Sequence, residues 1–265
     1  MHLAGLHIYP VKSLGGMTVG SARLGPRGLD GDRRWMVVDP DGRFLTQREL
    51  PALGQIGARL DGEVLELAAP TSLRWPTTRL PAQLAEGRRR AVTVWKDRCE
   101  AIVSVEGSAF LSSLVARPVE LVYMPDEVAR PVHHDRGGLV SFADGFPLLL
   151  VGQGSLDELN RRVGAPIPMS RFRPNLVVAG APAHAEDGWH TVHIGGIPMR
   201  VATPCARCSI TTVDDGRPGK EPLTTLSTYR RGEHLGYAAD GVYFGMNLIH
   251  DQQGLLTVGD EVVGG

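Results

Sequence analysis

Two of the three cysteines lie close together in the run Cys205-Ala-Arg-Cys208, with Arg207 between them. A cysteine thiolate is a soft ligand for transition metals, and an arginine stabilises a neighbouring anion. Four interpretations are open: a pair of small buried residues, part of a zinc site, a redox dithiol, or a single thiolate that binds a metal. This run is therefore the first candidate site.

Other residues of the chain argue against two of these interpretations. A structural zinc site needs four ligands, and only Cys99 and scattered histidines could complete it. A redox dithiol is typical of a helix N-terminus, whereas residues 209–213 are β-branched and predict a strand. Two interpretations therefore remain. The cysteines are either simply buried, or one thiolate binds a transition metal while Arg207 holds an anionic cofactor or favours the thiolate.

The elements that would position this run are strands. Residues 192–194 and 198–201 alternate around Gly195-Gly196, which predicts a hairpin. The chain would reach Cys205 from a strand and leave Cys208 along another at 209–213. Both cysteines are therefore expected in the loop between two strands.

Composition describes an ordinary globular chain. It has 265 residues, 42% hydrophobic residues and a net charge of −1, which allows one large or two modest domains. This charge gives no reason to expect a nucleic-acid partner, and the arginines at 88–90 are expected in a solvated loop. No run is long enough to span a bilayer and no basic leader opens the sequence, so we expect a cytoplasmic protein with reduced thiols.

The first half has a short-stranded pattern. Strands are expected at 3–11, 35–38, 44–46, 64–67, 73–75, 91–95 and 100–105, before a helix at 106–115. Lys12 and Ser13 follow the first strand and could hold a phosphate. Arg33 and Arg34 alternate along a strand, so one can point inward while the other is solvated. A domain boundary is expected near residue 116, because Arg117-Pro118 ends the helix.

The second half continues with strands expected at 119–124, 148–151 and 176–178. His133 and His134 are expected to be exposed on a loop, and Ser155 is expected to cap a helix. Arg171, Arg173 and Asn175 alternate on the approach to a strand, so all three could share one face.

Five motifs in this order resemble those of MOSC proteins that carry an N-terminal β-barrel domain. They are Tyr9-Pro-Val-Lys-Ser13, Gly31-Asp-Arg-Arg-Trp35, Phe172-Arg-Pro-Asn175, Cys205-Ala-Arg-Cys208 with Thr211-Thr-Val-Asp214, and Glu221-Pro-Leu223. The group includes the mitochondrial amidoxime-reducing component and bacterial proteins that reduce hydroxylaminopurines. The resemblance implies a mainly β, α+β fold with a MOSC N-terminal β-barrel domain at 1–116 and a MOSC β-barrel domain at 117–265.

The same resemblance implies a molybdenum cofactor, molybdopterin with molybdenum, lying between the two domains. Cys208 matches the metal ligand and is the expected catalytic residue. Cofactor-binding positions implied by the resemblance are Lys12, Ser13, Arg33, Arg173 and Asn175, to which the local chemistry adds Arg207. A family-level association with pyridoxal phosphate binding comes with the resemblance.

The implied activity is two-electron reduction of an N-hydroxylated or other N-oxygenated small molecule, with release of water. The sequence ends at Gly265 without the C-terminal ferredoxin-like domain of some bacterial relatives, so electrons are expected from a separate flavin reductase, ferredoxin or cytochrome. Asn247 stands where the mitochondrial proteins have a tyrosine near the metal. The alternative is a non-catalytic carrier of the cofactor or of sulfur, with a persulfide on Cys208, because MOSC domains also occur in cofactor-sulfurating proteins.

Overall fold

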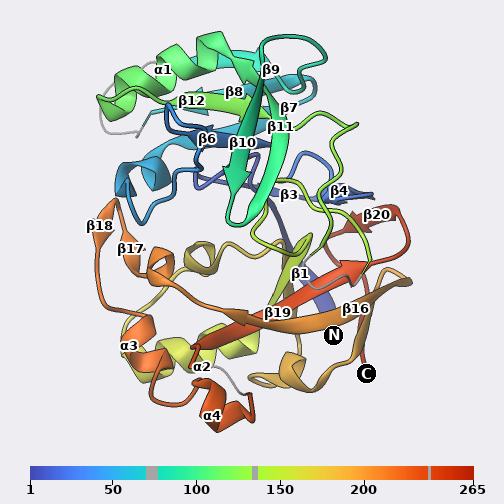
Figure 1. Cartoon of the computed structure of the whole chain (residues 1–265). Coiled ribbons are helices and arrows are strands. Elements are labelled where there is room, and N and C mark those ends of the chain that lie inside the picture. The colour runs from blue at the N-terminus through green and yellow to red at the C-terminus, as the bar shows by residue number, and fades with distance from the viewer. Residues whose placement is uncertain (70–76, 133–136, 238–239) are drawn as a thin grey trace. The chain divides into compact units, whose positions relative to one another are not determined.

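The computed structural model describes residues 1–69, 77–132, 137–237 and 240–265 (Figure 1). The strand expected at 73–75 and the histidines His133 and His134 therefore lie outside the described residues. The chain forms two compact units that interleave along the sequence. Unit 1 contains Met1–His7, Thr18–Asp30 and Phe146–Gly265, and unit 2 contains Ile8–Met17 and Gly31–Gly145.

One large sheet organises unit 1. Within the described residues it has eight strands in the order β21-β15-β16-β19-β13-β14-β1-β3. Their bounds are β1 (His2–Ile8), β3 (Met17–Val19), β13 (Leu148–Gly152), β14 (Leu176–Ala179), β15 (Thr191–Ile194), β16 (Ile197–Ala206), β19 (Tyr243–His250) and β21 (Val262–Gly264). The long strands β16 and β19 run antiparallel, side by side (Figure 1). Strand β16 thus carries the chain to the cysteine pair.

The hairpin expected before the cysteines is confirmed. Strand β15 pairs with β16 in antiparallel register from Thr191↔Arg200 to Ile194↔Ile197. Gly195 and Gly196 have φ angles of 56° and 81°, in the left-handed region that glycine enters without a Cβ clash. A two-residue turn of this kind matches the twist of the strands that it joins.

Shorter elements complete unit 1. They are β4 (Ser21–Gly25), β5 (Gly28–Leu29), β17 (Val213–Asp214), β18 (Arg217–Pro218), β20 (Gly254–Thr257), α2 (Gln153–Val163), α3 (Leu223–Leu226), α4 (Gly232–Leu235) and the 3-10 helices η3 (Met169–Phe172), η4 (Ala185–Gly188) and η5 (Ser209–Thr212). Helix α2 buries Leu156 and Leu159 in a core with Phe172 and Phe244. This face agrees with the helical spacing of the leucines.

The expected role of Ser155 as a helix cap is wrong. Helix α2 begins two residues earlier, with Gly152 at the N-cap. The Ser155 hydroxyl instead donates to the carboxylate of Glu186, at 2.7 and 2.9 Å from its two oxygens. The same carboxylate accepts from the Gly152 N–H at 3.0 Å, so Glu186 supplies the acceptor at the start of α2.

Unit 2 is built from two further sheets and one longer helix. In its described part the strand orders are β10-β11-β12-β6-β2 and β7-β8-β9. The bounds are β2 (Val11–Lys12), β6 (Trp35–Val38), β7 (Gly57–Asp61), β8 (Val64–Ala68), β9 (Thr77–Pro81), β10 (Arg89–Val94), β11 (Asp97–Ser104), β12 (Glu120–Tyr123), α1 (Val105–Val115) and η1 (Pro51–Gln55). Trp35, Leu111 and Leu121 are buried in its core. Helix α1 is confirmed, and the Ser104 hydroxyl accepts from Gly107 N–H at its start.

Two expectations about arginines in unit 2 are wrong. Arg34 is not solvated: its side chain is 15% exposed, lies over the Tyr123 ring and donates to the carboxylate of Asp126. The run 88–90 is not a solvated loop either: β10 begins at Arg89 and pairs with β11, although Arg88 and Arg89 are exposed as expected. Arg88 and Arg90 both pair with Glu120, and Arg89 pairs with Glu100 and Glu127. Glu100 and Glu120 on the neighbouring strands, with Glu127 after β12, neutralise this charge.

The mainly β, α+β fold class is confirmed, with strands throughout both units and four α-helices among the described residues. Strand β1 pairs with β14 in unit 1, and β12 pairs with β6 in unit 2. Each unit therefore contains strands from before and after residue 116. The domain boundary expected at that residue stays a prediction. Within the described ranges, no helix has the length and apolar character needed to cross a membrane.

Candidate functional site

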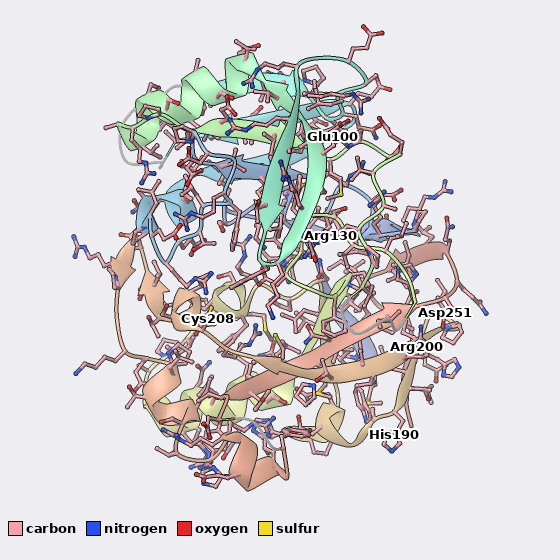
Figure 2. The ribbon with its side chains drawn as sticks, viewed as in Figure 1. Glu100, Arg130, His190, Arg200, Cys208 and Asp251 are labelled. Carbon is pink, nitrogen blue, oxygen red and sulfur yellow. The ribbon has the colours of Figure 1, made fainter. Side chains whose placement is uncertain are left out.

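Cys208 lies on the short segment between β16 and η5, with an exposed side chain (Figure 2). Its carbonyl oxygen accepts two hydrogen bonds from Thr211, from the N–H at 3.1 Å and from the hydroxyl at 2.9 Å. The hydroxyl of Thr212 donates to the Ser209 carbonyl at 2.8 Å. Hydrogen bonds from the two following threonines therefore fix the backbone that carries the thiol, while the sulfur faces outward.

The strand expected at 209–213 is mostly wrong. Residues 209–212 form the 3-10 helix η5, and only Val213 and Asp214 are in a strand, paired with β18. The physical reason is the two threonine hydroxyls, which bond carbonyls three residues back and favour a turn over an extended chain. Cys208 is thus the N-cap of one tight turn.

Arg171 supports this turn from η3. Its Nε donates to the Thr211 carbonyl at 2.9 Å and its Nη1 pairs with the Asp214 carboxylate at 2.7 Å. Its Nη2 reaches the Glu221 carbonyl at 3.3 Å. The arginine thus ties together both sides of the turn that follows Cys208, a role that its place in the sequence motif did not suggest.

Arg207 is anchored beside the thiol. Its backbone N–H donates to the Val242 carbonyl at 2.7 Å, and its Nη2 donates to the Phe172 carbonyl at 3.1 Å. The guanidinium lies over the Phe172 ring at 5.3 Å. Its Nε is buried and has no hydrogen-bond partner among the described residues. A buried N–H of this kind is suited to an acceptor from a bound anion.

Cys205 has a different environment from Cys208. It lies within β16, not in the expected loop, and packs against the core that contains Phe172 and Phe244. Its sulfur makes a weak contact with the Ala206 carbonyl at 3.8 Å. The two cysteines are therefore not an equivalent pair: one is packed as a small apolar side chain, and the other presents its thiol.

The shared face expected for Arg171, Arg173 and Asn175 is wrong. Residues 169–172 form η3, and Arg173 follows with a left-handed φ of 54°, so the backbone is not extended and side chains do not alternate. The Asn175 amide is 1% exposed and joins strands of unit 1: its Oδ1 accepts from Leu149 N–H and its Nδ2 donates to the His7 carbonyl, both at 3.2 Å. A cofactor contact by Asn175 stays a prediction.

Asn247 lies on β19, opposite Thr203 of β16 and Leu149 of β13. Its Nδ2 is 3.4 Å from the Pro204 carbonyl, a long hydrogen bond. The side chain is half-buried on the strand that borders the cysteine run. Asn247 thus lies beside the C-terminal half of β16, and its place near a metal stays a prediction.

Lys12 and its acceptors form a second group of candidate residues, in unit 2. The lysine is 6% exposed, and its Nζ donates to the Phe142 carbonyl at 2.9 Å and pairs with the Asp144 carboxylate. Trp95 Nε1 donates to the same carboxylate at 3.0 Å. Burial lowers the pKa of Lys12 more than Asp144 raises it. The Asp144 side chain is itself 70% exposed, and the charge and hydrogen bond of Lys12 hold its pKa well below its usual range.

Arg33 and Ser13 belong to this group. The Arg33 guanidinium lies over the Tyr9 ring at 4.5 Å and pairs with Asp32 at 2.6 Å. Desolvation opposes the charged form of Arg33, but Asp32 outweighs it and raises the arginine's pKa. The Ser13 carbonyl accepts from Gln47 at 2.7 Å. Arg33 precedes β6 with a left-handed φ of 48°, and its side chain is as buried as that of Arg34, so the alternation expected for this pair is wrong.

Three candidate cofactor-binding residues share an uncommon backbone. Ser13, Arg33 and Arg173 have φ angles of 72°, 48° and 54°, in the left-handed region that costs a residue with a Cβ roughly 1–2 kcal/mol. Such strain persists where the surrounding structure enforces it, and it is concentrated at functional sites. These positions are thus held in place by more than local preference.

The candidate residues thus form one group in each unit. Asn175, Arg173, Arg207 and Cys208 belong to unit 1, and Lys12, Ser13 and Arg33 to unit 2. Sequence reasoning noted Arg171 but not its role at the turn after Cys208, and it missed Asp144, which lies in the mostly apolar run 141–147 before a strand. Within the part of the chain that the structure describes, no three His, Cys, Asp or Glu side chains are grouped to hold a metal ion.

Comparison with known proteins gives matches over nearly the whole chain. Residues 1–118 match the MOSC N-terminal beta barrel domain, and residues 138–263 match the MOSC domain. Mitochondrial amidoxime-reducing component 1 of Homo sapiens is 30% identical over 282 residues, covering 98% of this chain and 82% of that protein. Mitochondrial amidoxime reducing component 2 of Bos taurus is 31% identical over 278 residues, covering 97% and 81%.

A third relative is named for another activity. Molybdenum cofactor sulfurase of Oryza sativa subsp. japonica is 31% identical over 263 residues, covering 87% of this chain but 31% of that longer protein. Taken together, the domain matches and the relatives show that the chain belongs to the MOSC-domain proteins that carry a MOSC N-terminal β-barrel domain. The resemblance noted in the sequence motifs is confirmed.

Proposed function

We propose that this chain is a molybdenum-cofactor-dependent reductase of N-hydroxylated or other N-oxygenated small molecules, with Cys208 as the metal ligand. The observation that carries the proposal is the difference between the two cysteines: Cys208 presents its thiol from a turn fixed by Thr211, whereas Cys205 is half-buried against the core. Relatives named for amidoxime reduction, about 30% identical over most of their length, support the reaction class.

The residues present fit such a cofactor. A cysteine thiolate is the soft donor that suits molybdenum, and Cys208 offers one at the surface of unit 1. The buried Arg207 Nε, with no partner in the described ranges, is available to an anionic oxygen or a pterin acceptor. Lys12 and Arg33 supply buried cations for a phosphate in unit 2. That one cofactor contacts both groups of residues is a prediction of the sequence resemblance.

When bound, the cofactor supplies the two-electron redox chemistry. The chain's own residues bind and orient it: Arg207, Arg173, Lys12 and Arg33 contribute positive charge, and Ser13 contributes a hydroxyl. Arg171 and Thr211 fix the backbone that carries the Cys208 thiol. Electrons come from a separate protein of flavin reductase, ferredoxin or cytochrome type, and the substrate is a small molecule.

A carrier of the cofactor or of sulfur is the second candidate. A single exposed thiol can hold a persulfide, and the chain shares 31% identity with a molybdenum cofactor sulfurase. In that case Cys208 passes on sulfur or cofactor and reduces no substrate. The two functions differ in what stays bound to the purified protein.

The test is a comparison of wild type with Cys208→Ser after expression in a host that makes molybdopterin. Both proteins are assayed with a chemical electron donor against amidoximes and hydroxylamines. We expect reduction by the wild type and a loss by orders of magnitude in the variant, because a serine oxygen is a harder ligand than a thiolate. Equal activity in both proteins would contradict the assignment of Cys208.

A further inference from the structure

Arg130 is an almost fully buried charged side chain of unit 2, with 2% of its surface exposed. Its Nε donates to the Asp97 carboxylate at 2.7 Å, at the start of β11. Its Nη1 donates to the carbonyls of Ser141, at 2.8 Å, and Ala143, and its Nη2 donates to the Asp144 carbonyl at 3.0 Å. One guanidinium therefore binds three backbone carbonyls of the short segment 141–144.

The same segment provides both acceptors of Lys12. The Phe142 carbonyl and the Asp144 carboxylate receive the lysine ammonium. Phe142 N–H donates to the Arg33 carbonyl at 2.9 Å, which ties the segment to the strand that follows Arg33. Segment 141–144 thus contacts two cations. Arg130 binds its backbone carbonyls, and the segment in turn binds the Lys12 ammonium.

The shape of this contact requires an arginine. Three carbonyls and one carboxylate are served at once by the planar five-donor fork, whereas a lysine is a point charge with three donors. Without those donors, the buried Ser141 carbonyl and the partly buried carbonyls of Ala143 and Asp144 would lack partners, and the segment would move to reach water. The Phe142 carbonyl and Asp144 would move with it, away from Lys12.

We propose that Arg130 is a positioning residue, whose buried guanidinium fixes segment 141–144 so that Phe142 and Asp144 hold the Lys12 ammonium at one place. This proposal rests on the proposed function in one respect, the binding of the cofactor by Lys12. The position of Lys12 itself can be measured on the full chain without cofactor.

Charge and geometry make separable contributions. The groups that act on the Lys12 ammonium are Asp144, which favours its charged form, and Arg130 and Arg33, which oppose it. Arg130→Lys keeps the positive charge and removes the fork. Arg130→Gln removes both, so the pair of variants distinguishes a held segment from a nearby charge.

The experiment is NMR of the lysine side chains in the full cofactor-free chain, which has only three lysines, Lys12, Lys96 and Lys220. The measured quantities are the exchange rate of the Lys12 ammonium protons with water and the Lys12 titration. In Arg130→Lys we expect exchange roughly tenfold faster or more, the size of one lost hydrogen bond to a charged group. In Arg130→Gln we expect the same faster exchange, and Lys12 should titrate at a higher pH than in Arg130→Lys, because the opposing charge of residue 130 is also absent.

Arg34→Gln is the matched control, because Arg34 is also a mostly buried arginine of unit 2 that donates to a backbone carbonyl, that of Met124. It should leave the Lys12 signals unchanged, and Lys96 and Lys220 should be unchanged in every variant. If an Arg130 variant does not fold, Asp97→Asn removes only the carboxylate that orients Nε, and a severalfold faster exchange is expected. Wild-type Lys12 exchange and titration in the folded variants would overturn the positioning role.

Failure of the proposed function gives a different result. Lys12 would become mobile in the Arg130 variants, while protein loaded in a molybdopterin-producing host would keep its full molybdenum and pterin. The positioning role would then hold, and the assignment of Lys12 to the cofactor would be withdrawn.

Discussion

Thr211 donates both its N–H and its hydroxyl to one atom, the carbonyl oxygen of Cys208, at 3.1 and 2.9 Å. The threonine is 4% exposed, so water does not easily replace either bond. The direction of the peptide after Cys208 is thus set by a side chain three residues later. This relationship explains how an exposed thiol can have a defined orientation.

Thr211→Val should loosen this turn without changing the volume of the side chain much. We expect a loss of about 1 kcal/mol in the free energy of unfolding, the usual contribution of one hydrogen bond, and a severalfold loss of reductase activity. Thr228→Val is the control, because its hydroxyl makes the same type of bond, to the Thr225 carbonyl at 2.8 Å, on an exposed turn. Equal effects on activity in the two variants would show that the Thr211 hydroxyl has no special role.

The two cysteines should respond differently to serine. Cys208→Ser should lose molybdenum-dependent reduction by orders of magnitude and keep its stability, because the side chain is exposed. Cys205→Ser should keep most activity and lose some stability, because it places a hydroxyl against the core. Melting temperatures and steady-state rates decide the question. An equal loss of activity in both variants, with metal still bound, would indicate a dithiol mechanism.

Asn175→Ala should destabilise unit 1 even without cofactor. The change leaves the Leu149 N–H and the His7 carbonyl without their side-chain partner, and each buried unsatisfied group costs about 1–3 kcal/mol. We therefore expect a loss of about 2–4 kcal/mol in the free energy of unfolding of the cofactor-free protein. Asn247→Ala, which removes only a 3.4 Å bond, should cost much less. An unchanged free energy of unfolding in Asn175→Ala would contradict the structural role and leave Asn175 with cofactor binding alone.

His184 should make the protein sensitive to mild acid. Burial, with the charge of Arg230, lowers the pKa of His184 from 6.5 to about 4. The folded state thus prefers the neutral ring, and the stability from this preference is complete above pH 6.5 and is lost as the pH falls towards about 4. Burial raises the pKa of Glu186, which acts in the opposite direction, so the wild type must be compared with a variant.

The measurement is the free energy of unfolding between pH 7.5 and 4.5. As the pH falls, the wild type should lose more stability than His184→Gln, in which the titrating ring is absent. His190→Gln changes an exposed histidine and should follow the wild type. Parallel curves for wild type and His184→Gln would show that His184 titrates equally in the folded and unfolded states.

Arg173→Ala should weaken retention of the cofactor by roughly ten- to a hundred-fold, the size of one charge-assisted contact of about 1.5–3 kcal/mol. Arg173→Lys should recover only part, because a point charge replaces a fork. Arg89→Ala removes two exposed ion pairs and should leave retention unchanged. Molybdenum and pterin are measured after gel filtration at moderate salt. If Arg173→Ala keeps its full cofactor content while Arg89→Ala loses it, the assignment of Arg173 to cofactor binding is wrong.

Periodicity and turn residues predicted much of the fold. The hairpin at Gly195-Gly196, strand β6 and helix α1 follow from alternation, glycine and helical spacing, which act over a few residues. Residues 209–212 were misjudged because β-branching favours a strand, while the threonine hydroxyls favour a turn by bonding nearby carbonyls. Propensity does not show which of these effects dominates.

The candidate site was predictable where a motif carries the chemistry, as at Cys208 and Arg207. Contacts between distant segments were not, because no local pattern shows that Arg130 binds the carbonyls of segment 141–144. The alternation of Arg171 and Arg173 failed for a similar reason: one left-handed residue, Arg173, breaks the period on which the argument depends. Supporting residues of a site are therefore the part that needs the structure.

The most direct test of the central claim is the metal and pterin content of the full chain purified from a host that makes molybdopterin, beside Cys208→Ser prepared in the same way. The account predicts stoichiometric molybdenum and pterin in the wild type, together with reduction of amidoximes or hydroxylamines that depends on Cys208. Wild-type protein without molybdenum that releases sulfide on treatment with a reductant would contradict it and favour the sulfur carrier.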